Sequence, residues 1–336
     1  MAKRQHHFSA TEGALSVKEC GHLAEGWFAD GEMRQLSEYT LVARRSTLRK
    51  LIWFLEQQGA ETVGTNEIRA FLSYVANGHK QDGGRWGNTE TRAKRAVRPT
   101  TVHTYFAILR SFFAFVVEEG ALPVSPIAGI KPPVARADQV QPFTPEQVSA
   151  LLGAAKKSKN GKRDEALLLF LLDTGARASE VCALKREDLD LTNRRCQVIG
   201  KGNKRRTIFF GTSTKQALWR YIGEQKHAAG DPLFIGDRGL CQGEALQRCG
   251  LLKLIHRLGS AAGVDAVRCS PHTFRHTFAV EFLRAGGNTF TLQQLLGHTS
   301  LAMTNRYVAL AQADLEAQHR AFSPADRLRG AKGKGR

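Results

Sequence analysis

Residues 272–287, HTFRHTFAVEFLRAGG, predict a helix that carries a cluster of polar, phosphate-binding side chains. His272 and Arg275 are three residues apart, so one face of the helix presents both. His276 follows His272 by four residues, and two histidines at that spacing can hold zinc. No glutamate stands between them and no carboxylate nearby completes a metal site, which argues against zinc. The segment therefore indicates chemistry based on imidazole and guanidinium groups.

The next segment, LGHTSLAMTNRY at 296–307, adds one histidine and one tyrosine. His298 follows Gly297, and Tyr307 stands nine residues further on. Taken alone these residues are weak signals, because a histidine can cap a helix end and a tyrosine is often half-buried with its hydroxyl satisfied. They become informative only together with the other motifs of the chain.

A third motif, TGARASE at 174–180, places an arginine at the start of a predicted helix. A glycine turn delivers Arg177 there, and Glu180 follows one turn later. The guanidinium can bind a phosphate through two hydrogen bonds, and the positive end of the helix adds to the field. Glu180 can orient Arg177 through a salt bridge. The alternative is an ordinary arginine–glutamate pair on a helix surface.

Residues 194–210 predict a β-hairpin with a basic turn. Two apolar runs, CQVI at 196–199 and TIFF at 207–210, flank the turn GKGNK at 200–204. Lys201 in this turn could deliver a proton or enter a DNA groove, and a solvated basic turn is the alternative. The candidate DNA contacts in the hairpin are Arg194, Arg195, Lys204, Arg205 and Arg206.

Together these groups fit one reaction, the breaking of a phosphodiester bond. Arg177 and Arg275 can bind the non-bridging oxygens and stabilise the charge of the transition state, a task that metal ions perform in other enzymes. Tyr307 is available as nucleophile, and Lys201 can protonate the leaving oxygen. A covalent intermediate would conserve the bond energy of the broken strand. The sequence has no dense carboxylate cluster of the kind that a two-metal nuclease requires.

The composition narrows the class of partner. The 336 residues include 49 Lys and Arg against 31 Asp and Glu, a formal net charge of +18. Such an excess indicates a polyanionic partner, most often nucleic acid, although solubility alone is the alternative. The absence of a long apolar run and of a signal peptide argues against membrane insertion and secretion. Six cysteines without close spacing predict reduced thiols, and we expect a cytoplasmic, nucleoid-associated protein.

The length and the distribution of prolines predict two domains joined by a linker. We expect a polar N-terminal arm at 1–20 and a helical core DNA-binding domain at 21–130. A linker at 131–143 is proline-rich, and proline disfavours helix. It leads to a catalytic domain at 144–322, and residues 323–336 form a basic tail.

Two features mark the first domain. An apolar stripe between Pro99 and Gly120 predicts a helix that faces the core. Before it, the Gly-rich basic segment 78–98 lacks apolar periodicity and predicts a long loop, either an added DNA contact or a disordered surface loop. The candidate DNA contacts of this domain are Arg44, Arg45, Arg92, Lys94, Arg95 and Arg98.

The four motifs, in their order along the chain, resemble those of the tyrosine recombinases or phage-type integrases, in the Xer-like branch. The resemblance is strong over 144–322 and weaker over 20–130. It implies a mainly α fold with a small β-hairpin or sheet (α+β). In that fold, a helical core-binding domain and a catalytic domain form a C-shaped clamp on DNA. It also implies cleavage and rejoining of DNA strands without a metal, ATP or another cofactor.

The resemblance further implies a role for each motif residue. Tyr307 attacks the scissile phosphate to give a 3′-phosphotyrosyl intermediate, Lys201 protonates the 5′ oxygen, and His272 is the acid or base for the tyrosine. The two arginines stabilise the transition state, His298 hydrogen-bonds the phosphate, and Glu180 supports the first arginine. The implied catalytic set is Arg177, Lys201, His272, Arg275, His298 and Tyr307.

The same resemblance also implies how the protein assembles on DNA and what its reaction achieves. It implies a homotetramer on double-stranded DNA recombination sites, a monomer or weak oligomer when free, and a C-terminal helix at 311–322 that docks into a neighbouring protomer. The reaction would integrate, excise or resolve a mobile DNA element. Two alternatives stay open: a type IB topoisomerase-like enzyme that relaxes DNA, and a catalytically silent DNA-binding protein on the same scaffold. The intact catalytic set argues against silence.

Overall fold

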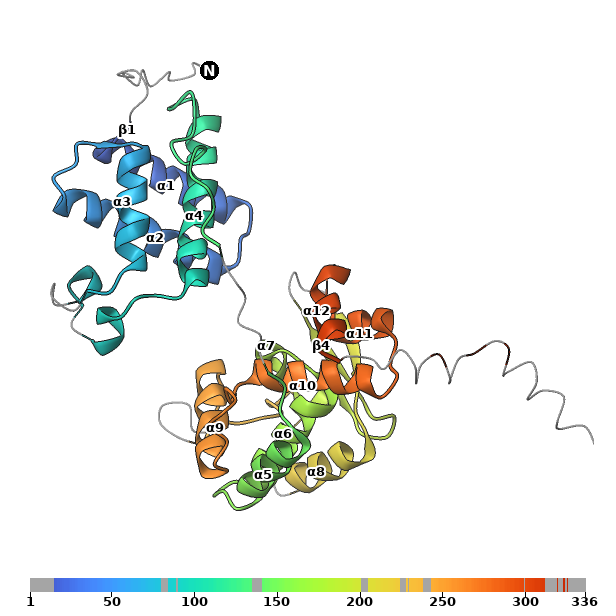
Figure 1. The fold of residues 1–336 in the computed structure, drawn as a ribbon. Helices are drawn as coiled ribbons and strands as arrows, with labels where there is room; N and C mark the ends of the chain where they lie inside the picture. The colour runs from blue at the N-terminus through green and yellow to red at the C-terminus, as the bar shows by residue number, and fades with distance from the viewer. Residues whose placement is uncertain are drawn as a thin grey trace, which may run out of the picture. The chain divides into compact units, whose positions relative to one another are not determined.

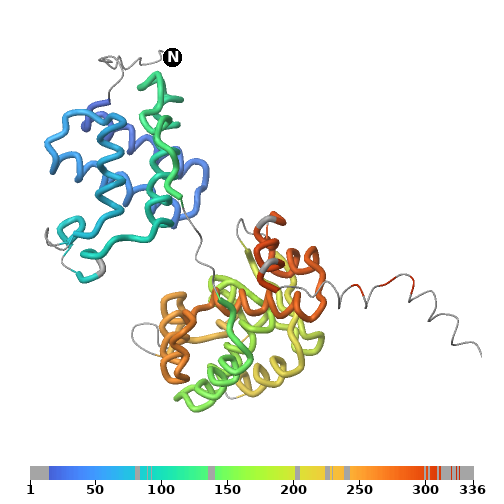
Figure 2. The backbone as a smooth tube through the Cα atoms, in the orientation of Figure 1, coloured from blue at the N-terminus to red at the C-terminus, as the bar shows by residue number. Residues whose placement is uncertain are grey.

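The computed structural model describes residues 15–79, 84–88, 90–134, 141–200, 205–223, 228, 230–237, 243–298, 300–311, 319, 323 and 325. The chain divides into two units, Met1–Asp138 and Gln139–Arg336. Figures 1 and 2 show that each unit is built mainly of helices, with short strands added. The predicted mainly α fold with a small sheet is therefore confirmed.

The first unit is a helical bundle with one short pair of strands. Its helices are Val17–Met33 (α1), Glu38–Gln57 (α2), Thr65–Ala76 (α3) and Pro99–Glu118 (α4). The strands Leu15–Ser16 (β1) and Thr62–Val63 (β2) pair antiparallel. Two short 3-10 helices precede α4, Arg85–Gly87 (η1) and Thr91–Lys94 (η2).

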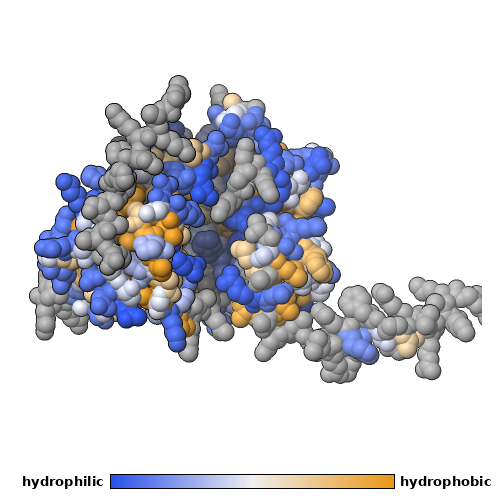
Figure 3. All heavy atoms as spheres, turned by 90° about the horizontal axis from the view of Figure 1, so that it is seen from above, coloured by the Kyte–Doolittle hydropathy of each residue, from blue (hydrophilic) through white to orange (hydrophobic). Residues whose placement is uncertain are grey.

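Helix α4 carries the apolar stripe that the sequence predicted. Its buried face consists of Val102, Phe106, Leu109, Phe112, Phe113 and Val116. By length and composition, α4 is also the one described helix that could cross a membrane. Its buried face belongs to the hydrophobic core of the first unit, as expected for the core helix of a globular bundle. Hydrophilic residues predominate on the molecular face shown in Figure 3.

The expectation of a polar arm over 1–20 is wrong at its end. Leu15 lies in β1 and is buried, and α1 begins at Val17. Ser16 caps this helix, because its hydroxyl accepts a hydrogen bond from the Glu19 N–H while the Glu19 carboxylate accepts one from the Ser16 N–H. Cys20, inside the expected arm, is fully buried. Residues 1–14 lie outside the described part of the chain.

The described part of the basic segment 78–98 is packed against the bundle, so the disordered alternative is wrong for these residues, and the added DNA contact stays a prediction. The buried Arg85 guanidinium donates hydrogen bonds to the carbonyls of Asn77 at 2.6 Å and Arg95 at 2.8 Å. The neighbouring Trp86 ring lies 5.1 Å from the Tyr74 ring and 5.7 Å from the Trp53 ring, centroid to centroid. A buried arginine and an aromatic cluster thus hold this segment in a defined conformation.

The second unit surrounds a central helix with further helices and one sheet. Its helices are Pro145–Lys156 (α5), Gly161–Thr174 (α6), Ala178–Ala183 (α7), Thr212–Ile222 (α8), Arg248–Ala261 (α9), Pro271–Arg284 (α10), Thr289–Leu296 (α11) and Leu301–Ala311 (α12). A 3-10 helix spans Arg186–Asp188 (η3). The strands Leu189–Asp190 (β3), Arg195–Ile199 (β4) and Arg205–Phe209 (β5) form an antiparallel sheet in the order β3-β4-β5.

The hairpin β4–β5 confirms the strands predicted on either side of the basic turn. Cys196 pairs with Ile208 and Val198 with Arg206 across the hairpin. Cys196, Val198 and Ile208 point into the core, so one face of the sheet is buried. Helix α8 and strand β3 were not predicted from the sequence.

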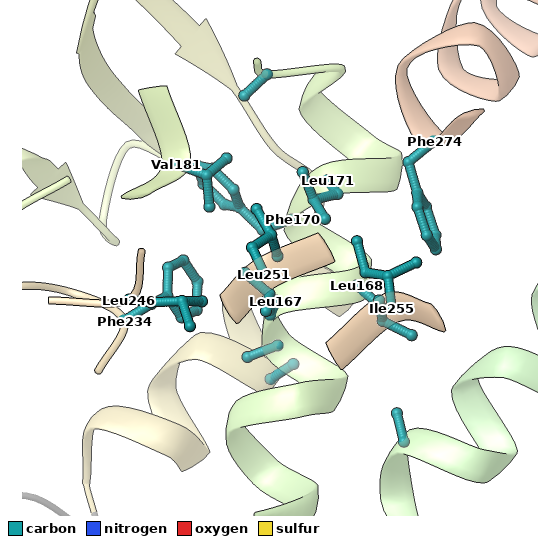
Figure 4. Packing of buried hydrophobic residues seen from close by; sticks show 14 of the residues in the cluster. Leu167, Leu168, Phe170, Leu171, Val181, Phe234, Leu246, Leu251, Ile255 and Phe274 are labelled. Carbon is teal, nitrogen blue, oxygen red and sulfur yellow. The ribbon is translucent and has the colours of Figure 1, made fainter. Parts of the chain in front are cut away.

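The core of the second unit is built around α6. Leu167, Leu168, Phe170 and Leu171 of this helix are fully buried. Figure 4 shows them together with side chains from α7, α9 and α10. The predicted linker also ends earlier than residue 143, because Phe143 is buried in this core and its N–H donates to the Thr277 hydroxyl at 2.9 Å. Residues 135–140 lie outside the described part of the chain.

Candidate active site

Helices α7, α10, α11 and α12 bring together most of the predicted catalytic residues. Figure 1 shows α10, α11 and α12 next to one another, and each pair of them is in contact. The residues they carry or flank are Arg177 at the start of α7, His272 and Arg275 on α10, His298 after α11, and Tyr307 on α12. Lys201 and Lys204 lie outside the described residues, and so does most of the predicted C-terminal helix at 311–322.

Arg275 is the most deeply placed cation of the site. Its side chain is buried, and its guanidinium donates to the carbonyl of Gly175 at 2.8 Å and to that of Leu296 at 2.7 Å. Burial and the nearby charge of Arg177 lower the pKa of Arg275 to about 10. The side chain therefore stays cationic at neutral pH, held by two backbone groups from different motifs.

Arg177 and Glu180 form the local pair that the sequence predicted. The Arg177 N–H donates to Glu180 Oε2 at 2.7 Å, and its Nη1 donates to Oε1 at 2.9 Å. Nη2 of Arg177 donates to the Gly297 carbonyl at 2.8 Å. Burial alone would raise the pKa of Glu180, but hydrogen bonds from Arg206 and Arg177 outweigh it and hold the pKa below its usual value. The carboxylate is thus charged at neutral pH and fixes Arg177.

Arg206 is engaged within the protein, which corrects its expected place among the outward DNA contacts. Its guanidinium forms an ion pair with Glu180, with Nη2 donating to Oε2 at 2.8 Å and Nη1 to Oε1. Its Nε donates to the Leu295 carbonyl at 3.2 Å. Its neighbour Arg205 is exposed. The alternation of a strand, which turns successive side chains to opposite faces, accounts for the difference.

The nucleophile candidate Tyr307 lies among apolar side chains and two imidazoles. The ring of His298 stacks on it at 6.1 Å between centroids, and His298 Nδ1 is 2.9 Å from the Thr304 hydroxyl. Burial raises the pKa of Tyr307, whereas the charges of Arg275 and other arginines lower it by less. The phenol is therefore protonated at neutral pH.

His276 stands beside the same tyrosine, a position that sequence reasoning missed. Its ring is 5.2 Å from the Tyr307 ring, centroid to centroid. Burial and the neighbouring His272 lower the pKa of His276 to about 4, and burial and Arg275 do the same for His298. The side chain of His272 is exposed, and partial desolvation and the charge of Arg275 lower its pKa as well. The sequence did hold a sign of this position, because His276 directly follows Arg275 on a predicted helix. Only a zinc role was considered for His276.

Two of the predicted DNA contacts in the first unit are tied to neighbouring side chains. The Arg44 guanidinium lies 4.0 Å above the Trp27 ring, where desolvation lowers its pKa. Arg45 forms an ion pair with Glu32. Arg44 is thus partly buried against an aromatic ring, whereas the pair of Arg45 and Glu32 is exposed to solvent. Arg95 and Arg98 are exposed, and the Arg92 side chain lies outside the described part.

The remaining hairpin arginines lie on the surface of the sheet. Arg194 is exposed and donates to the Thr212 hydroxyl at 3.2 Å. Arg195 is exposed and pairs with Asp190 at 3.0 Å. Among the residues that the structure describes, no group of three or more His, Cys, Asp or Glu side chains could hold a metal ion.

Two arginines, a carboxylate that fixes one of them, imidazoles and a tyrosine make up the described site. This set defines a class of phosphoryl-transfer sites in which arginines provide the positive charge and a tyrosine hydroxyl is the nucleophile. The model of the phage integrase family matches residues 141–314, and the chain belongs to this family.

Several tyrosine recombinases are similar to this chain. The tyrosine recombinase XerD of Listeria innocua is 31% identical over 296 residues, which cover 86% of this chain and 94% of that protein. The tyrosine recombinase XerC of Xanthomonas campestris pv. campestris is 29% identical over 277 residues, or 82% of this chain and 80% of that one. These relatives identify an enzyme that cleaves and rejoins DNA strands, and they favour neither the topoisomerase-like nor the silent alternative.

Solved structures share the fold. The Tn1549 transposon integrase in complex with transposon right end DNA aligns with a TM-score of 0.67 at 21% identity, covering 87% of this chain and 94% of that one. A lambda integrase dimer bound to a COC′ core site aligns with a TM-score of 0.64 at 18% identity, covering 84% of this chain and 96% of that one. The helical units with a small sheet are therefore the fold of integrases.

The turn at Gly175 gives a first testable prediction. Gly175 has a φ of 58°, and an added Cβ would lie 2.5 Å from Phe278 Cδ1 and 2.9 Å from Leu296 Cδ2. Gly175→Ala is expected to lower the free energy of unfolding by about 2–4 kcal/mol and to slow DNA cleavage, because the carbonyl that holds Arg275 must move. Thermal unfolding and single-turnover cleavage measure the two effects.

Gly263→Ala is the matched control for this substitution. Gly263 has a φ of 66°, and nothing lies within 4 Å of an added Cβ. This variant is expected to lose only about 1–2 kcal/mol, the cost of the left-handed backbone, and to cleave DNA normally. If Gly175→Ala cleaved as fast as Gly263→Ala, the Gly175 turn would have no part in the site.

Proposed function

We propose that this protein is a site-specific DNA recombinase in which Tyr307 attacks the scissile phosphate. The observation that supports this role best is the position of Tyr307 on α12, packed against α10 beside the rings of His276 and His298. There the charges of Arg275, Arg306 and Arg177 lower its pKa against the effect of burial. Cations near the hydroxyl suit a nucleophile that must lose its proton while it attacks a negatively charged phosphodiester.

The chemical step exchanges one phosphoester bond for another. The bond from the Tyr307 oxygen to phosphorus forms while the bond from phosphorus to the 5′ oxygen breaks, which leaves a 3′-phosphotyrosyl link and a free 5′-hydroxyl. His272 accepts the phenolic proton, and Lys201, in the turn between β4 and β5, donates a proton to the 5′ oxygen. The two arginines and His298 stabilise the charge on the non-bridging oxygens. Attack by a 5′-hydroxyl from a second duplex reverses the step and joins the new strand.

Duplex DNA that carries recombination sites is the partner of this chemistry. We assign the described exposed cations Arg95, Arg98, Arg194, Arg195 and Arg205 to phosphate contacts, together with Lys94, Arg92 and Lys204. The first unit, from Leu15 onward, forms the core-binding domain, and the second unit, which includes Phe143, forms the catalytic domain. The protein works as a homotetramer on DNA in the cytoplasm, at the nucleoid, with the segment 311–322 docked into a neighbouring protomer.

A partner-exchange assay tests this function. The protein is incubated with a duplex whose sequence comes from the flanks of its own gene, together with a labelled second duplex of the same sequence. A recombinase joins strands of the two duplexes, whereas a topoisomerase-like enzyme rejoins only the original partners. Relaxation of supercoiled DNA without any exchanged product would contradict the proposal.

Chelation gives a second test of the proposed mechanism. Because arginines take the place of metal ions in this scheme, cleavage is expected to proceed unchanged in EDTA. Single-turnover cleavage is measured in EDTA and again with added magnesium, on the same DNA and at matched ionic strength. Loss of cleavage in EDTA with recovery in magnesium would show that the arginines do not suffice.

A further inference from the structure

The C-terminal end of α11 binds three arginines through three consecutive carbonyls. The Leu295 carbonyl accepts from Arg206, the Leu296 carbonyl from Arg275, and the Gly297 carbonyl from Arg177. The last carbonyls of a helix lack partners within the helix and carry a partial negative charge, so they attract guanidinium groups. Two of the three arginines belong to the predicted catalytic set, and Arg206 is the third.

Arg206 also holds the carboxylate that fixes Arg177. Glu180 is only 2% exposed and accepts hydrogen bonds from the Arg177 N–H, from the Arg177 guanidinium and from both Nη atoms of Arg206. These two arginines are the charged groups whose hydrogen bonds lower the pKa of Glu180. Without Arg206, Arg177 would be the one arginine left to pair with the buried Glu180 carboxylate.

The packing around Arg206 leaves little freedom for its side chain. Gly297 has a φ of 63°, and a Cβ at that position would lie 3.2 Å from the Cδ, Nε and Nη1 atoms of Arg206. All three nitrogens of its guanidinium donate to protein acceptors. The side chain therefore connects strand β5 to Glu180 on α7 and to the turn after α11.

We propose that Arg206 is a positioning residue that holds Glu180 and the 295–297 turn, so that Arg177 and Arg275 face the phosphate in the right geometry. This inference rests on the proposed function and goes beyond it, because it has Arg206 act through Glu180 and the Leu295 carbonyl, with which its guanidinium forms hydrogen bonds. The opposite reading makes Arg206 one more phosphate contact of the basic hairpin, like Arg205. The two readings predict different effects on affinity and on cleavage.

The test compares single substitutions in the full-length protein. Arg206→Gln removes the positioning contact, Arg205→Gln removes an exposed cation of the same strand, and Arg220→Gln removes a surface arginine that pairs with Glu165 at 3.3 Å. For each variant, DNA affinity is measured at several salt concentrations. The cleavage rate is measured with saturating suicide DNA over a range of pH. Circular dichroism and thermal unfolding check that each variant folds.

We expect Arg206→Gln to bind DNA nearly as well as wild-type protein but to cleave it about 10²-fold more slowly at saturation. Since Arg206 lowers the pKa of Glu180, its loss raises that pKa, and cleavage by the variant falls further as the pH drops through the new value. Arg205→Gln is expected to lower affinity and to reduce the salt slope by about one, and Arg220→Gln to behave as wild type.

Arg206→Lys keeps the charge but cannot reach Glu180 and the Leu295 carbonyl together, so its cleavage rate is expected to lie between those of Arg206→Gln and wild type. This variant carries the test if Arg206→Gln does not fold. A loss of affinity and salt slope in Arg206→Gln, with normal cleavage at saturation, would overturn the proposal and make Arg206 a phosphate contact. A wild-type protein that formed no adduct would contradict the proposed function itself. That result is distinct from a failure of the Arg206 proposal, which shows only in the variants.

Discussion

The Tyr307→Phe variant is expected to bind DNA as tightly as wild-type protein and to form no covalent adduct with it. Phenylalanine keeps the ring that packs beside His298 and His276, so the fold around α12 is preserved. Only the hydroxyl is lost, and no other group can form the phosphotyrosyl bond. The cleavage rate should fall on the order of 10³-fold or more. Suicide DNA and denaturing gels detect the adduct, and a mobility-shift assay measures binding.

Tyr221→Phe is the matched control for this variant. Tyr221 is likewise a buried tyrosine of the second unit, where its ring stacks on Phe234. Its loss of a hydroxyl is expected to leave adduct formation intact. An adduct that persisted in Tyr307→Phe would show that another residue is the nucleophile.

Arg275→Lys is expected to produce the second largest effect. A lysine keeps the positive charge, but one ammonium on a flexible stem cannot hold the two-carbonyl geometry of a planar guanidinium. The Gly175 and Leu296 carbonyls that Arg275 bridges would lose at least one donor. We expect the cleavage rate to drop about 10²–10³-fold, because the cation no longer faces the transition state, while DNA affinity changes little. Single-turnover rates and binding curves separate the two quantities.

The same substitution at Arg284 serves as the comparison. Arg284 lies on the same helix, at the surface, and pairs with Glu281 at 2.8 Å. Arg284→Lys is expected to cleave normally. If Arg275→Lys also cleaved normally, the transition state would not depend on the guanidinium, and the role assigned to Arg275 would be wrong.

Local patterns predicted most of the catalytic unit. Arg177 and His298 lie at helix ends, which glycine turns mark in the sequence, whereas Arg275 and Tyr307 lie within helices. At the start of α5, for example, Thr144 caps the helix, because its side chain accepts from the Gln147 N–H at 3.3 Å. The order of the motifs then indicated which helices must meet, because one reaction needs all of them.

Helices with small residues on their buried face were missed. The buried face of α1 combines Cys20, Ala24 and Gly31 with Trp27 and Phe28, and that of α8 combines Thr214 and Ala217 with Leu218 and Tyr221. Small side chains allow close helix packing but contribute little to an apolar stripe, so periodicity does not reveal them. Their burial depends on partner helices that are distant in the sequence.

Sequence patterns also did not predict contacts between side chains that are far apart in the chain. Arg206 and Glu180 are 26 residues apart and lie on a strand and a helix. Nothing near either residue distinguishes Arg206 from the exposed arginine beside it, except the alternation of the strand. The described part of segment 78–98 is similar, because Trp86 contacts Trp53 and Tyr74 only in the folded bundle.

The most direct measurement of the central claim is to identify the residue that becomes attached to DNA. Wild-type protein is incubated with nicked suicide DNA from the flanks of its own gene, the complex is digested with protease and nuclease, and the modified peptide is sequenced by mass spectrometry. The account predicts a nucleotide 3′-phosphate on Tyr307 and on no other residue. A phosphate on a different side chain, or cleaved DNA with no attached protein, would contradict it.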